Sequence, residues 1–354
     1  MAPGQDTSPA GEERNDDPQL TRARHPAGPA LPAAGKAVPP AAGSTGGTRP
    51  LVGIALKLLS VTSFVIMVTV IKMTGSAMPT GEIVFFRSAF ALVPVFIYLA
   101  MRGQMAIAWR TSRPILHLVR GLVGVSAMGL SFYGIAQLPL PDAIAIGYAM
   151  PLLTVVFAAI FLGESVRVFR WTAVAIGLTG VLVISWPRLT LFEAGLGSTG
   201  EALGVIALLL SATFGASAAM LVRRLTVTEK TPTIVLYFSL SAAILALFTF
   251  PFGWVMPDLY IFSLMLIAGI CGGLAQIFLT QSYRHADVST IAPFEYASIL
   301  FGLAIGYLLF DEVPTASMLI GTAIVVAAGI FIILREHRLG LERRAQRRLV
   351  GPQG

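Results

Sequence analysis

Four ionisable side chains lie inside long apolar runs of this 354-residue sequence: Lys57, Arg87, Arg120 and Glu295. A charge near the middle of a bilayer costs about 2.5–3.5 kcal/mol on insertion scales, so such a residue normally faces a cavity or a partner. A buried arginine suits a carboxylate, a phosphate or an electron-rich ring, and a buried carboxylate can bind a cation or take up a proton. Binding and proton movement are therefore the chemistry that these residues could perform.

Arg87 lies near the start of the apolar run that covers residues 82–101. We expect it to reach into a solute pathway, with snorkelling to the interface or a structural ion pair as the alternative. Three roles are open for Glu295: pairing with Arg87 or Arg120, binding a cationic group, or taking up a proton. Lys57 and Arg120 lie near the ends of their runs, where we expect the basic side chains to snorkel.

The pentapeptide Ala-Pro-Phe-Glu-Tyr at residues 292–296 places a proline beside this carboxylate. Proline removes a backbone donor and clashes with the preceding helical turn. Membrane helices tolerate such a break where neighbours or a cavity satisfy the freed backbone groups. We therefore predict hinges at Pro293 and Pro151, with a simple packing kink as the alternative. The residues that Pro293 would present to a cavity are Phe294, Glu295 and Tyr296.

Polar and aromatic residues of other runs complete the predicted substrate pathway. These residues are Tyr133, Tyr148, Gln276 and Gln281. An aromatic-lined cavity suits a planar ring ligand, whereas a tyrosine near a helix end can simply anchor the helix at the interface. We predict no catalytic residue, metal or cofactor, because the chain has a single cysteine and lacks HExxH, GxSxG and Walker sequences.

The elements that must position these residues are membrane-spanning helices. The chain is 55% hydrophobic and 12% charged, against about a quarter charged for a soluble domain. Apolar runs long enough to span a bilayer, about 20 residues, recur along the chain. We predict an all-α membrane protein with ten spans. They cover about residues 51–71, 82–101, 114–136, 142–162, 170–187, 201–222, 233–252, 258–282, 287–310 and 316–334.

The distribution of charge predicts the orientation. The net charge of +7 comes from basic residues in loops and tails, which indicates membrane orientation rather than nucleic-acid binding. Loops on one side are rich in arginine, and those on the other hold only Lys72 and Arg188. Both termini are therefore expected in the cytoplasm. Residues 1–50, rich in Pro, Ala and Gly, would form a disordered tail, and residues 336–354 a basic tail.

The chain also repeats itself. A constant offset of 148 aligns Tyr148 with Tyr296 and Glu164 with Glu312. This predicts two five-span repeats, which are inverted because each has an odd number of spans, with a site at their interface. Tyr148 and Tyr296 would then face the pseudo-symmetry axis. The predicted repeats cover residues 51–187 and 201–335, joined by a linker over 188–200.

Gly302 and Gly306 form a GxxxG sequence in the ninth predicted span. This motif allows close approach of two helices. We expect it to serve packing within the chain, with a homodimer as the alternative.

Several longer stretches together resemble one family. They read FVIMVTVIKMTG, GEIVFFRSAFALVPV, FYGIAQLPLPDAIAIGYAMPLLTVVFAAIFLGESV and STIAPFEYASILFGLAIGYLLFDEVP. They resemble the EamA family of the drug/metabolite transporter superfamily across residues 51–335. The resemblance implies ten helices with both ends inside, and movement of small organic solutes by alternating access without ATP. An arginine at position 87 matches the family pattern, whereas Asp311-Glu312 departs from the Gly-Glu seen at residues 163–164.

The resemblance also implies a solute class. Within the family, the chain is similar to proteobacterial transporters, some of which import riboflavin or S-adenosylmethionine, while other members export amino acids and related metabolites. We therefore expect a secondary transporter in a bacterial inner membrane, with riboflavin uptake as the first candidate. The alternatives are S-adenosylmethionine uptake, amino-acid or metabolite export and, less favoured, a multi-pass membrane enzyme, a channel or a scaffold. The expected partners are a small-molecule solute and the lipid bilayer.

Overall fold

The computed structural model contains helices and connecting turns, with no strand among its described residues. It describes residues 50–75, 77–162, 167–193, 199–225, 228–229, 231–286 and 288–349. Within these ranges nine helices are long and apolar enough to cross a membrane, and a shorter apolar helix covers Thr233–Leu247. The ten segments agree with the ten predicted spans. The predicted N-terminal tail lies outside the described residues, except for Pro50, as do Glu164 and part of the predicted linker.

The first repeat begins at Pro50 and its fourth helix is broken. Its helices are α1 (Pro50–Thr74), α2 (Thr80–Met101), α4 (Pro114–Gln137), α5 (Leu140–Gly147), α6 (Ala149–Leu162) and α7 (Val168–Glu193), with the short α3 (Met105–Ala108) between α2 and α4. The break between α5 and α6 lies at Tyr148. Pro151 accounts for it, because a proline ring clashes with the carbonyl four residues earlier, here that of Gly147.

The second repeat has the same plan. Its elements are α8 (Thr199–Leu225), α9 (Thr231–Leu247), η1 (Phe250–Phe252), α10 (Leu259–His285), α11 (Val288–Ile291), η2 (Ala292–Tyr296), α12 (Ala297–Phe310) and α13 (Ala316–Leu349). The Ala-Pro-Phe-Glu-Tyr pentapeptide is the 3₁₀ segment η2, so the helix changes its winding at Pro293. Both predicted interruptions are present; movement at them stays a prediction.

Two boundaries differ from those expected. The seventh span was expected to run to residue 252, but α9 ends at Leu247 and η1 follows, because Pro251 cannot continue the α-helical ladder. α13 runs to Leu349, through most of the predicted basic tail. The sequence there is dominated by Arg, Glu, Leu and Ala, which are strong helix formers.

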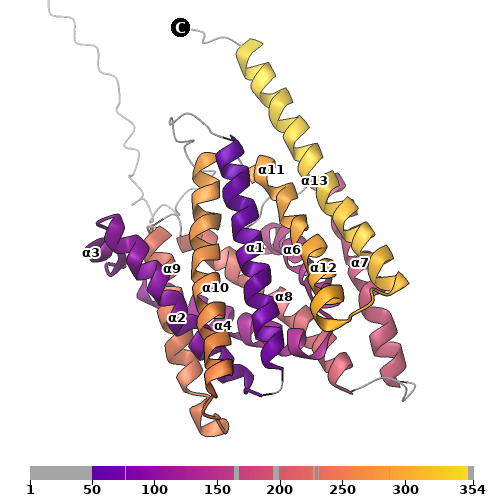
Figure 1. The fold of residues 1–354 in the computed structure, drawn as a ribbon. Coiled ribbons are helices and arrows are strands. Elements are labelled where there is room, and N and C mark those ends of the chain that lie inside the picture. Colours follow the sequence, from indigo (N-terminus) through magenta and orange to yellow (C-terminus); the bar gives the residue numbers. More distant parts are fainter. Residues whose placement is uncertain are drawn as a thin grey trace, which may run out of the picture. The chain divides into compact units, whose positions relative to one another are not determined.

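The helices pair as two equivalent sets. α1 packs along α10, the third helix of the second repeat, and α8 packs along α4, the third helix of the first. The last helices of both repeats, α7 and α13, pack on each other, and Figure 1 shows α1 beside α10 and α13 beside α7. Exchanging the two repeats maps one pair onto the other. This is the arrangement expected of two related repeats.

The repeats run in opposite directions. Gly53 at the start of α1 lies against Ala286, which follows α10, whereas Gly204 near the start of α8 lies against Leu138, which follows α4. Lys72, near the end of α1, donates a hydrogen bond to the Leu138 carbonyl. α1 and α8 therefore start at opposite ends of the bundle. We call these the Pro50 end and the Thr74 end, after the two limits of α1.

Both described ends of the chain lie on one side of the bundle. α1 begins at the Pro50 end, and Phe169 near the start of α7 contacts Phe331 near the middle of α13, which continues toward the same end for 18 more residues. This agrees with an even number of crossings, while the assignment of the Pro50 end to the cytoplasm stays a prediction.

The GxxxG sequence contributes to packing inside the chain. A Cβ atom added at Gly302 would lie 2.5 Å from Ile144, and one at Gly306 would lie 2.9 Å from Pro141. Both glycines of α12 therefore face α5 of the other repeat. A homodimer stays an untested prediction.

Candidate functional site

Two adjoining cavities lie between the repeats. Their volumes are about 420 Å³ and about 600 Å³. Both have walls from α2 and α4 of the first repeat and from α8, α9 and α10 of the second, and the larger cavity is also lined by α1, α5 and α6. The residues that line both cavities are Arg87, Arg120, Val222, Phe238, Gln276 and Leu279. Among the described lining residues, the two arginines carry charge and there is no carboxylate.

Arg87 is held deep in the bundle by α2. Its side chain is 5% exposed, and Nε donates to the sulfur of Met67 at 3.4 Å. α2 approaches α10 closely at Gly272, where a Cβ atom would lie 2.8 Å from Nη2 of Arg87. The glycine therefore leaves the space that the guanidinium occupies. Arg87 forms no ion pair with any residue in the described part of the chain.

Arg120 lies on α4, across the cavities. Its Cζ atom is 4.1 Å from the centroid of the Phe238 ring, well within the range of a cation–π contact. Nε and Nη1 are buried and have no hydrogen-bond partner among the described residues. A Cβ atom at Gly124, one turn further along α4, would collide with this guanidinium. The expectation that Arg120 snorkels to the interface is therefore wrong, because the ring and the glycine hold it inside.

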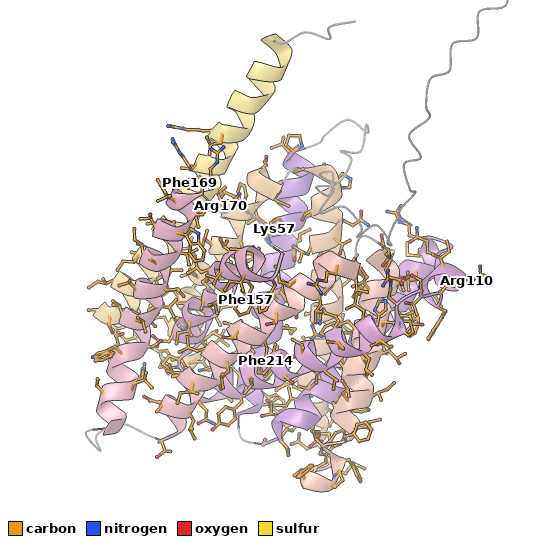
Figure 2. All side chains as sticks on the ribbon, turned by 180° about the vertical axis from the view of Figure 1, so that it is seen from behind. Lys57, Arg110, Phe157, Phe169, Arg170 and Phe214 are labelled. Carbon is orange, nitrogen blue, oxygen red and sulfur yellow. The ribbon has the colours of Figure 1, made fainter. Side chains whose placement is uncertain are left out.

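Glu295 and Lys57 form an ion pair that was not expected. The Lys57 Nζ to Glu295 Oε2 distance is 3.2 Å, and the side chains are 2% and 55% exposed. Figure 2 shows Lys57 among the helices, whereas Arg110 lies at the periphery. The expectation that Lys57 snorkels is wrong. Of the three roles left open for Glu295, pairing with Arg87 or Arg120 is absent from the described residues, and Lys57 is its partner instead. The cause is the break in the ninth span, because η2 lies against α1.

Tyr148 and Tyr296, which occupy matching places in the two repeats, stack on each other. Their ring centroids are 5.0 Å apart and the rings are inclined by 23°. Tyr148 Oη donates to the Glu295 carbonyl oxygen at 2.6 Å and is 2.7 Å from the Ser298 hydroxyl. The two helix breaks thus meet, as their pseudo-symmetry predicted.

The structure divides the other predicted pathway residues. Gln276 lines both cavities, together with Arg87. Gln281 donates to the Tyr98 hydroxyl between α10 and α2. The predicted residues that line neither cavity are Tyr133, Tyr148, Gln281, Phe294, Glu295 and Tyr296. Their assignment to the pathway, and the hinge roles of Pro151 and Pro293, stay predictions.

Sequence reasoning missed Arg120 and Phe238 as cavity residues. Arg120 gave a signal, a charge inside an apolar run, but its nearness to the helix end favoured snorkelling. The residue type of Phe238 did not single it out, since the chain holds 21 phenylalanines. The only pointer to its place was the similarity of IVFFRSAFAL at residues 83–92 to IVLYFSLSAA at residues 234–243, which pairs Phe238 with Arg87.

Two sets of ion pairs join the repeats at the Thr74 end. Glu312, just beyond α12, binds Lys72 at 2.7 Å and accepts a hydrogen bond from the Leu140 amide at 2.7 Å. Arg188 of α7 binds Asp142 of α5 at 3.1 Å and Glu201 of α8 at 2.8 Å. Ion pairs therefore connect the helices at the Thr74 end. The smaller cavity lies nearer the other end, because the start of α9, next to the Pro50 end, lines it.

The known proteins that this chain is similar to include a pseudopaline exporter, an S-adenosylmethionine uptake transporter and a riboflavin transporter. The chain is 34% identical over 283 residues to a pseudopaline exporter of Pseudomonas aeruginosa, across 78% of this chain and 94% of that protein. It is 26% identical over 288 residues to an S-adenosylmethionine uptake transporter of Rickettsia conorii, across 81% and 94%. It is 30% identical over 293 residues to a riboflavin transporter of Rhizobium johnstonii, across 81% and 90%.

The fold and the family agree with these relatives. A solved crystal structure shares the fold with a TM-score of 0.55 and 20% identity, across 78% of this chain and 95% of the other. The relatives are transporters and exporters by name, so the chain is a transporter of a small molecule and not an enzyme. The EamA-like transporter family matches residues 51–186 and 202–335. The resemblance seen in the sequence is confirmed, and the chain belongs to the EamA-like transporter family.

Proposed function

We propose that this transporter moves a small organic metabolite by alternating access, with the two cavities as part of the solute pathway. The observation that carries the proposal is that helices of both inverted repeats line both cavities. A site at the interface of such repeats changes its accessible side when one repeat rocks against the other. Cavities of a few hundred cubic ångströms suit a metabolite-sized ligand.

The ion pairs at the Thr74 end support a particular state. Glu312 joins α1 and α5 to the segment that follows α12, and Arg188 joins α7 to α5 and α8, so both sets favour closure at that end. Alternating access then requires them to break and the cavities to close toward the Pro50 end. With the orientation expected from the loop charges, this state is open toward the cytoplasm of a bacterial cell.

Riboflavin uptake remains a specific candidate from the sequence, alongside S-adenosylmethionine uptake and metabolite export. The relatives named for riboflavin, S-adenosylmethionine and pseudopaline support transport of a metabolite but name different solutes. The aromatic pair on which the riboflavin candidate partly relied, Tyr148 and Tyr296, lines neither cavity.

The test is a comparison of solute distribution in both directions. Bacteria that express the chain, or an unrelated membrane protein at the same level, are given labelled riboflavin, S-adenosylmethionine and amino acids. Uptake is measured, and small molecules in cells and medium are compared by mass spectrometry. We expect at least one metabolite to redistribute with saturable kinetics only in cells that express this chain. Identical distributions in both cultures would contradict the proposal.

A further inference from the structure

We propose that the transported solute carries a carboxylate or phosphate group, which binds between Arg87 and Arg120. This rests on the proposed function, because it identifies the solute class of the same cavities. Both arginines line both cavities, and the described lining contains no carboxylate. The cavities thus have a formal charge of +2 before any solute binds.

Three other basic side chains of the spans are also mostly buried, and each has a carboxylate partner. Lys57 binds Glu295, Lys72 binds Glu312, and Arg188 binds Asp142 and Glu201. Each of these cations has a carboxylate from within the chain. Arg87 and Arg120 have no carboxylate partner among the described residues, although Arg87 is only 5% exposed. Buried charges are normally paired, so the partner of these two is expected from outside the chain.

The local geometry keeps both guanidinium groups available. Gly272 and Gly124 provide the space for Arg87 and Arg120, as the positions of added Cβ atoms show. The Phe238 ring supports Arg120 through its π face, which uses none of the N–H donors. Two nitrogen atoms of Arg120 consequently stay without a partner among the described residues. A planar guanidinium with free donors is suited to two-point binding of a carboxylate or a phosphate.

Neutral donors in the same walls would hold the rest of the solute. Gln276 lines both cavities, and Ser239 and Thr280 line the smaller one. The remaining surface is largely aliphatic. We therefore expect a metabolite with one anionic end and a less polar body. Riboflavin has no anionic group at neutral pH and S-adenosylmethionine carries more positive than negative charge, so both fit this lining less well.

The test uses the purified full chain in liposomes loaded with a small-molecule extract of the expressing bacterium. Loss of each solute is followed by mass spectrometry against protein-free liposomes. The variants are Arg87→Gln, Arg120→Gln and Arg87→Lys, and the matched control is Arg102→Gln, an exposed arginine that stacks on Tyr98 outside the cavities. We expect the solutes that leave to be carboxylates or phosphates. Their rate should fall about tenfold or more in the two cavity glutamine variants, since a charged hydrogen bond is lost.

The outcomes separate the inference from the proposed function. Wild-type release of only solutes that lack both a carboxylate and a phosphate group would overturn the inference and leave the transporter intact. Unchanged release of an anion from both glutamine variants would do the same. Release of no solute by the wild type would overturn both. Thermal unfolding provides a second readout: without solute the glutamine variants should be as stable as the wild type or more so, whereas a structural role for the arginines requires lower stability.

Discussion

Arg87 and Phe238 each lie directly over a glycine of the opposite repeat, and the alignment of residues 83–92 with residues 234–243 places them at matching positions. A Cβ atom at Gly272 would lie 2.8 Å from Nη2 of Arg87, and one at Gly124 would lie 2.8 Å from Cε2 of Phe238. The two glycines are themselves 148 residues apart, the offset of the repeat. The backbone is therefore pseudo-symmetric at the cavities, whereas the charge is not. The ring in the second position supports Arg120 instead of adding a third cation.

This arrangement predicts that Gly124→Ala and Gly272→Ala impair transport. A methyl group at either site must displace a guanidinium, since the added Cβ atom would be closer than any normal contact. The matched control is Gly129→Ala, on the same helix α4, where no atom lies within 4 Å of the added Cβ atom. The control should be neutral or slightly stabilising, because alanine favours helix by about 1 kcal/mol over glycine. Initial transport rates and thermal unfolding of all three variants provide the measurement, and an effect of Gly129→Ala equal to the other two would refute the steric account.

Some features of the fold and the site can be predicted from the sequence because each leaves a recognisable pattern of residues. The length of the apolar runs and the charges of the loops predict ten spans and place both ends of the chain on the same side. The prolines predict the helix breaks near Tyr148 and Tyr296. These signals come from single residues or from the composition of a segment, so they can be interpreted without knowing how the helices pack. The stacking of the two tyrosines followed from the repeat, because equivalent residues near a two-fold axis must approach each other.

The ion pairs could not be predicted in the same way. Lys57 and Arg120 both lie near helix ends, where a long side chain can reach water, yet both remain inside. Whether each side chain stays buried depends on which segment packs beside it. For Lys57 it is η2, and for Arg120 it is Phe238 on α9, contacts between residues more than one hundred positions apart. Such contacts depend on the arrangement of the helices rather than on the sequence of any one.

The pair between Lys57 and Glu295 predicts unequal effects of its two neutral variants. Glu295→Gln leaves a 2% exposed ammonium group without its carboxylate, whereas Lys57→Met leaves a carboxylate that is 55% exposed. We therefore expect Glu295→Gln to lower the unfolding temperature more than Lys57→Met does, and the double variant to recover part of the loss. The coupling free energy should be about 1 kcal/mol, low in the usual range because one partner is half exposed.

Transport by the same three variants distinguishes a structural pair from a proton-coupling site. If Glu295 only fixes η2 against α1, the double variant should regain transport along with stability. If Glu295 takes up protons during transport, stability returns while activity and its pH dependence stay lost. Additive effects of the two substitutions on stability would show that the pair does not form in the membrane.

Glu229 predicts a pH-dependent stabilisation at the Pro50 end. Its Oε1 accepts hydrogen bonds from the Thr111 hydroxyl at 2.8 Å, from the amide and hydroxyl of Ser112 at 2.7 and 3.0 Å, and from the Arg113 amide at 3.1 Å. Burial raises the pKa of the Glu229 carboxyl, but the hydrogen bonds from Thr111 and Ser112 together lower it by more. The pKa therefore lies below its ordinary value of 4.5. The carboxylate thereby joins the segment after α8 to the start of α4.

A lowered pKa means that the folded state favours the charged form, so this stabilisation is complete above about pH 4.5 and is lost as the pH falls through the folded pKa. Glu229→Gln should therefore be less stable than the wild type at pH 7, by about 1 kcal/mol, the net contribution of a typical hydrogen bond. The difference should shrink below pH 4.5, where the wild type becomes neutral too. Thermal unfolding from pH 7 to pH 4 measures it, with Asp311→Asn, at an exposed position, as the control. A constant difference across this range would exclude the charge of Glu229 as its source.

The contacts of Glu312 predict a gate at the Thr74 end. Glu312→Gln replaces the ion pair with Lys72 by a neutral amide, which also binds the Leu140 amide less strongly. Since hydrogen bonds to charged groups contribute about 1.5–3 kcal/mol, the open population at this end should rise about tenfold or more. The Leu140 side chain is fully buried in the closed end, so its position reports opening.

Labelling of a cysteine at position 140 measures this population. In a background where the single native cysteine is removed by Cys271→Ser, Leu140→Cys should react faster with a membrane-impermeant maleimide when Glu312→Gln is also present. The control is Asp258→Asn, which lies at the same end and retains a side-chain oxygen for the cap of α10. Equal rates with and without Glu312→Gln would exclude the gate. The side of the membrane from which the reagent acts also tests the orientation: with the Pro50 end in the cytoplasm, labelling must occur in intact cells, because the Thr74 end then faces the outside.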